Sequence, residues 1–72
     1  MSLKSQILFL VKSQGEASIN ELEELCRQER YKISNYERRA RELSNEGLIS
    51  AIKSRTKDGI EFISGYRAVD NF

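Results

Sequence analysis

The fold of this chain is decided by residues 34–49, which read SNYERRARELSNEGLI. The apolar side chains of this stretch recur every three or four positions, at Tyr36, Ala40 and Leu43. This spacing is that of a stripe along one side of an α-helix. At about 100° per residue, the opposite side carries Arg38, Arg41 and Asn45, with Asn35 and Glu42 beside them. The stretch therefore predicts a helix with one buried side and one basic side.

Sequence signals mark both ends of this helix. Ser34-Asn35-Tyr36-Glu37 has the pattern of a capping box, in which the serine hydroxyl and the glutamate each satisfy a free backbone amide. Gly47 follows the last periodic residue, where the chain often adopts a left-handed conformation. The predicted helix covers about residues 35–46.

Two more helices are predicted before it. A stripe of apolar residues at helical spacing predicts a helix over about residues 3–13, with Gly15 just after its end. A capping box at Ser18-Ile19-Asn20-Glu21 then begins a helix over about residues 19–30. The core expected from the three stripes and the next segment contains Leu3, Ile7, Leu10, Val11, Leu22, Leu25, Tyr36, Ala40, Leu43 and Leu48.

After Gly47 the period of the apolar residues changes. Residues 48–53 and 60–69 have the pattern of two strands, with a turn at Lys57-Asp58-Gly59 between them. Asp-Gly favours a type I′ hairpin turn, whose two central residues both need positive φ. Residues 17–19 are a candidate for a short third strand. The predicted fold is therefore α+β: a three-helix bundle with a C-terminal β-hairpin over about residues 48–69, as a single domain spanning residues 1–72.

Composition excludes several classes of function. The chain has 72 residues, no histidine and a single cysteine, Cys26, so neither a zinc finger nor a disulfide framework can form. No phosphate-binding loop and no nucleophile motif occurs. We therefore expect a non-enzyme with no cofactor, no metal and no small-molecule ligand. The longest apolar run, residues 7–11, is far below the roughly 20 residues of a membrane span, and the lone cysteine indicates a cytoplasmic setting.

The order of these elements resembles the winged helix-turn-helix family, in particular small domains of bacteria and their phages. The resemblance covers residues 18–69 and is carried by the basic helix, by its Leu-x-x-x-Gly-Leu-Ile ending at residues 43–49, and by Gly65-Tyr66-Arg67. It implies that the third helix enters the major groove of DNA and that the hairpin, or wing, touches the backbone or minor groove. The turn at residues 29–33 lacks the glycine of many helix-turn-helix proteins. That departure leaves the docking angle open.

The candidate DNA-binding residues lie in two groups. On and before the third helix they are Lys32, Ser34, Asn35, Arg38, Arg41 and Asn45. Arginine can pair with guanine and asparagine with adenine, whereas lysine, serine and free helix amides suit phosphates. On the hairpin they are Lys53, Arg55, Lys57 and Arg67. The first three alternate along the chain, so we expect them on one face of the first strand.

The function expected is that of a double-stranded DNA-binding module, either a small transcriptional regulator or a phage accessory protein. The alternative is a protein-interaction module, favoured by the net charge of only +1 and by the acidic second helix. Self-association is a further interpretation, through an exposed patch of Phe9 and the terminal Phe72. RNA binding is less favoured because no exposed aromatic stacking platform is predicted.

Overall fold

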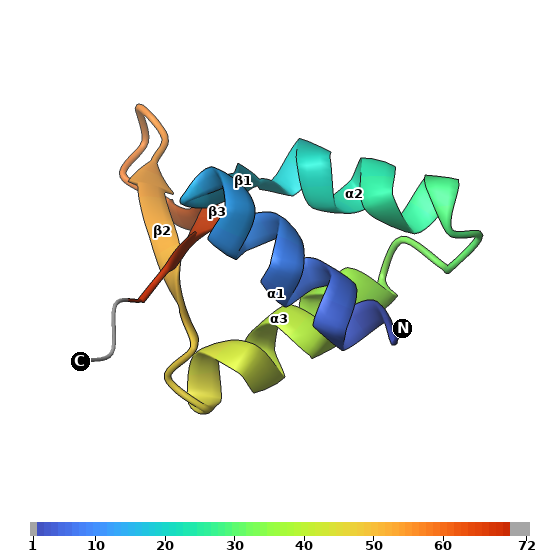
Figure 1. Cartoon of the computed structure of the whole chain (residues 1–72). Coiled ribbons are helices and arrows are strands. Elements are labelled where there is room, and N and C mark those ends of the chain that lie inside the picture. The colour runs from blue at the N-terminus through green and yellow to red at the C-terminus, as the bar shows by residue number, and fades with distance from the viewer. Residues whose placement is uncertain (1, 70–72) are drawn as a thin grey trace.

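Three helices and a three-stranded antiparallel sheet make up the structure, a computed structural model that describes residues 2–69 (Figure 1). Its elements are α1 (Leu3–Gln14), β1 (Glu16–Ser18), α2 (Ile19–Gln28), α3 (Asn35–Asn45), β2 (Ile49–Arg55) and β3 (Glu61–Ala68). The sheet order is β1-β3-β2, and Figure 1 shows α1 running between α2 and α3. The predicted α+β class, the three helices and the hairpin are confirmed. β1 begins and ends one residue before the short strand expected at residues 17–19.

The core lies where the three helices meet the inner face of the sheet. It is formed by Leu3, Ile7, Val11, Ala17, Leu22, Cys26, Tyr36, Ala40, Leu43, Ile49 and Tyr66. The predicted stripes of α1, α2 and α3 therefore have the right phase. The prediction was wrong for Leu10, Leu25 and Leu48, which are only partly buried at the rim of the core. Leu10 and Leu25 instead line a shallow surface groove between α1 and α2.

The starts of α2 and α3 differ. At α2 the Ser18 hydroxyl accepts a hydrogen bond from the Glu21 amide at 3.2 Å, as the capping box predicts. At α3 the expected cap is wrong, because Ser34 has helical backbone angles and makes no capping hydrogen bond. A capping side chain needs an extended backbone at its own residue. The first amides of α3 donate instead to the carbonyls of the preceding turn, with Asn35 bonded to Lys32 at 3.0 Å.

α2 and α3 end in the same way. After α3, Gly47 has a φ of 78°, its amide donates to Ser44, and the Leu48 amide donates to Leu43 at 3.1 Å. This Schellman motif turns the chain sharply into β2. α3 thus ends one residue before the predicted bound.

α2 ends at Gln28 rather than at the predicted residue 30. Arg30 lies outside it with a φ of 62°, and it is the only residue other than glycine with positive φ in the described part of the chain. Arg30 therefore holds the left-handed position that Gly47 occupies after α3.

The hairpin turn lies at the predicted Lys57-Asp58-Gly59, but its backbone conformation differs from the prediction. The Gly59 amide donates to the Thr56 carbonyl at 3.0 Å, and the Thr56 amide donates to Ile60 at 2.9 Å. Gly59 has a φ of 83°, whereas Asp58 does not have a positive φ. The predicted type I′ turn is therefore wrong. A loop over residues 56–60 needs only one left-handed residue, which Gly59 supplies.

The middle strand β3 is irregular at one point. Ile52 pairs with Gly65 and Lys53 pairs with Ile63, so that Ser64 is an extra residue in β3. Such a bulge bends the strand and increases its twist. Next to it, a Cβ on Gly65 would lie 2.5 Å from the Ala17 carbonyl oxygen, so only glycine allows β1 to approach β3 here.

No helix within residues 2–69 is long and apolar enough to cross a membrane.

Candidate functional site

The outer side of α3 carries the side chains that its helical phase predicted. Arg38 and Asn45 are exposed, opposite the buried residues Tyr36, Ala40 and Leu43. Within residues 2–69, the structure shows no ion pair for Arg38. The candidates at the helix start, Ser34 and Asn35, are also exposed. α3 therefore presents a free guanidinium and an amide to solvent.

Arg39 differs from its neighbour Arg38. Its guanidinium lies 2.6 Å from the Glu42 carboxylate, one turn along the same helix. This contact partly neutralises both groups at the edge of the outer side. The local basic charge of α3 thus comes from Arg38 and Arg41.

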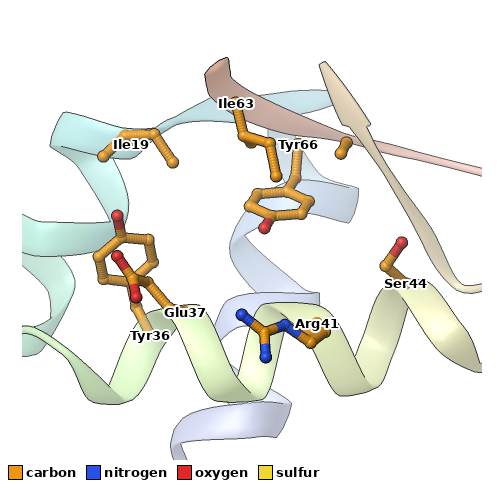
Figure 2. A pocket seen from close by; sticks show the side chains of 8 residues that line it. Ile19, Tyr36, Glu37, Arg41, Ser44, Ile63 and Tyr66 are labelled. Atoms are coloured by element: carbon orange, nitrogen blue, oxygen red, sulfur yellow. The ribbon is translucent and has the colours of Figure 1, made fainter. Parts of the chain in front are cut away.

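A hollow of about 380 Å³ separates α3 from the sheet (Figure 2). Its lining consists of Ile19, Tyr36, Glu37, Arg41, Ser44, Ala51, Ile63 and Tyr66. Arg41 is exposed, as predicted, and its side chain lies along α3 at the edge of this hollow, on the opposite wall from Tyr66 of β3 (Figure 2). Sequence reasoning did not assign Glu37, Ser44 or Tyr66 to a binding site. Glu37 and Ser44 neighbour Arg41 along α3, but Tyr66 joins them only through the packing of the sheet against the helices.

Two tyrosines of the hollow are almost completely buried. Tyr66 is 6% exposed and Tyr36 is 7% exposed, and neither hydroxyl forms a hydrogen bond within residues 2–69. Burial raises the pKa of both hydroxyls above the usual 10.0. For Tyr66 the positive charge of Arg41 acts against this rise in pKa, whereas the carboxylate of Glu37 adds to it. Both phenols are therefore neutral hydrogen-bond donors at physiological pH.

The hairpin contributes two cations on the side of the hollow. Side chains alternate along a strand, so Lys53 and Arg55 share the face of β2 that carries Ala51, a lining residue of the hollow. Both are exposed and both contact Glu61 of the paired strand. The distance is 3.5 Å from Lys53 Nζ and 3.7 Å from Arg55 Nη2 to the carboxylate.

The other two hairpin candidates lie elsewhere. Lys57 is in the turn beyond the end of β2, so the prediction that it continues the strand face is wrong. Arg67 follows Tyr66 in β3 and therefore points from the opposite face of the sheet, where its register partners are Glu16 and Ser50. The structure thus separates Arg67 from Lys53 and Arg55.

The α2 side of the molecule has a different character. Arg27 lies 3.2 Å from Glu24 and 3.8 Å from Glu23, so the cation of this helix is paired with its own carboxylates. Lys32, in the turn between α2 and α3, is exposed and unpaired within the described residues. Tyr31 beside it is 38% exposed. Unpaired basic charge is therefore found on α3 and the turn before it rather than on α2.

The patch predicted for self-association is described in part. Phe9 is 67% exposed on α1, as its place off the apolar stripe predicts. Phe72 lies outside the described residues.

Comparison of the chain with known protein families and with curated proteins finds no match.

Proposed function

We propose that this protein is a non-catalytic module that binds double-stranded DNA. In this proposal the chain is a winged helix-turn-helix domain, with α3 in the major groove and the β2–β3 hairpin acting as the wing against the backbone. A small transcriptional regulator or a phage accessory protein is the setting that fits such a module. The observation that carries the proposal is the position of exposed cations around one hollow. Arg41 of α3 lines it, and Lys53 and Arg55 extend from the face of β2 that carries its lining residue Ala51.

The outer side of α3 suits the recognition of bases. The major groove, about 12 Å wide, admits an α-helix with its side chains. Arg38 and Asn45 are exposed there. A guanidinium can donate two hydrogen bonds to guanine, and an amide can bond adenine through a donor and an acceptor. These two residues are therefore the candidates for base contacts.

The hairpin suits contacts with phosphates. Lys53 and Arg55 both contact Glu61, but all three side chains are largely exposed, with 64%, 74% and 47% of their surface accessible. Exposed ion pairs contribute only about 0–1 kcal/mol, so a DNA phosphate can replace the carboxylate at small cost. The hairpin cations are thus available to a polyanion.

The test is a salt series of duplex binding. The fluorescence anisotropy of a short labelled duplex of random sequence is measured against protein concentration at several salt concentrations. If about four to six phosphates are neutralised, log K falls against log salt with a slope of roughly −4 to −5. Arg27→Gln is the matched control, because it removes one cation from α2, where Arg27 is paired with Glu23 and Glu24. Its slope is expected to equal that of the wild type. Absence of binding at low salt, or a flat response, would refute the proposal.

The second candidate function is a protein-interaction module. Apolar side chains on the hairpin favour it, because Ile60 is 63% exposed and Phe62 is 46% exposed. Exposed apolar residues close together are typical of interaction surfaces. This candidate replaces the first if the duplex assay shows no binding.

A further inference from the structure

The hollow between α3 and the sheet holds hydrogen-bond donors that no residue of the described chain satisfies. Tyr66 is more than nine-tenths buried, yet its hydroxyl lines the hollow and has no hydrogen-bond partner within residues 2–69. The ring is buried, but the hydroxyl oxygen itself is open to solvent in the hollow. A donor that lines a hollow, and that no described residue uses, is available to an acceptor from outside this chain.

The surroundings of this hydroxyl specify the acceptor. Arg41 lines the hollow on α3, on the opposite wall from Tyr66 (Figure 2), and it forms no ion pair within the described residues. A guanidinium carries five donors and no acceptor, and a neutral phenol supplies one more donor. The Ser44 hydroxyl adds a third group at the same wall of α3. A cation with hydroxyl donors around it suits a small anion with several acceptor oxygens.

We propose that Arg41 and Tyr66 form a phosphate-binding site that holds one backbone phosphate of a bound duplex. This inference rests on the proposed function, because the phosphate is that of the DNA strand that lies between α3 and the hairpin. It assigns Arg41 to the backbone and leaves base recognition to Arg38. Both arginines are exposed, but Arg41 lines the hollow between α3 and the sheet and Arg38 does not.

Glu37 weakens this site in the free protein. Its carboxylate lines the same hollow one helical turn before Arg41, and no ion pair joins the two residues. A carboxylate next to a phosphate is repulsive. Replacing Glu37 by glutamine keeps the shape of the side chain and removes that charge. If a phosphate enters the hollow, Glu37→Gln strengthens binding to duplexes of every sequence.

The experiment compares five proteins on a preferred duplex, obtained by selection from random sequences, and on a random duplex. They are the wild type, Tyr66→Phe, Arg41→Gln, Glu37→Gln and the control Tyr31→Phe, which removes a phenol hydroxyl from the exposed turn before α3. Tyr66→Phe is expected to weaken binding to both duplexes equally, by about tenfold, because it removes a hydrogen bond to a charged group. Its salt slope stays unchanged because the phenol is neutral. Arg41→Gln also weakens both duplexes, and its slope becomes shallower by about 0.9.

The outcomes separate the two proposals. Failure of the wild type to bind either duplex overturns the proposed function and this site with it. The site alone is overturned if the wild type binds and Tyr66→Phe matches it. It is equally overturned if Arg41→Gln weakens only the preferred duplex, since Arg41 would then contact a base. Thermal unfolding of each variant checks that a loss of binding does not come from a loss of fold, and Tyr66→Phe retains the ring that fills the core.

Discussion

Replacing Arg30 by glycine is expected to stabilise this protein. Arg30 follows the end of α2 with a φ of 62°, in the left-handed region. Its amide donates to the Arg27 carbonyl at 3.2 Å, and the next amide, of Tyr31, donates to Cys26 at 2.8 Å. These two hydrogen bonds end the helix and require the left-handed backbone. The Arg30 side chain is exposed and forms no ion pair within residues 2–69, so its removal breaks no ion pair seen there.

The expected change in the free energy of unfolding combines one favourable contribution with two unfavourable ones. The left-handed conformation costs a residue with a Cβ about 1–2 kcal/mol, which glycine avoids. Glycine gives the unfolded chain more freedom, which lowers stability by about 0.4–1 kcal/mol. Loss of a cation near the C-terminus of α2 removes about 0.3 kcal/mol of helix-dipole interaction. The net gain in the free energy of unfolding is about 0.5 kcal/mol, which raises the Tm of a domain of this size by about 2–4 °C.

The assay is thermal and urea unfolding of the wild type, Arg30→Gly and two controls. Arg30→Ala keeps the Cβ and therefore the strain, so its Tm is not expected to rise. Arg27→Gly places glycine inside α2 and is expected to lower stability by about 1 kcal/mol. A Tm of Arg30→Gly at or below that of the wild type would refute the reasoning, as would an equal rise in Arg30→Ala.

Three other perturbations test the core, the division of labour between α3 and the hairpin, and the buried phenols. Leu43→Ala is expected to cost about 2–5 kcal/mol in the free energy of unfolding, because Leu43 is 1% exposed in the core; a Tm equal to that of the wild type would disprove the phase of α3. Arg38→Ala should cost about 1–3 kcal/mol on a preferred duplex and less on random DNA, whereas Lys53→Ala should weaken all duplexes alike and make the salt slope shallower by about one unit; selected-site binding of both variants distinguishes these effects. Burial raises the pKa of Tyr66 above 10.0, so its contribution to stability is present below pH 10.0 and is lost as the pH rises through the folded-state pKa. The urea midpoint of the wild type should therefore fall as the pH rises above 10.0, and it should fall less steeply in Tyr66→Phe. An equal dependence of the midpoint on pH in the two proteins would contradict this.

The sequence by itself determined the elements and the phase of each helix. Leu3, Ile7 and Val11 on α1, and Tyr36, Ala40 and Leu43 on α3, are buried as their spacing predicts. Helix periodicity is a local property, because residues three or four positions apart lie on the same side of any α-helix. The exposed position of Arg38 follows from that same phase. The glycine ends of α1 and α3 were also predictable, since a left-handed backbone is cheap only for glycine.

Only the tertiary structure decided which of the basic residues come together. Arg41 and Tyr66 line one hollow because the sheet packs against α3 through β2, and neither residue carries a local signal of the other. The place of β3 depends on contacts between distant segments: the bulge at Ser64 and the close approach of Gly65 to Ala17. The faces of β3 are set by that register, since a shift of one residue in pairing moves every side chain to the other side. Alternation along the strand already places Tyr66 and Arg67 on opposite faces, but only the pairing and packing of the sheet decide that the face of Tyr66 is the one that lines the hollow.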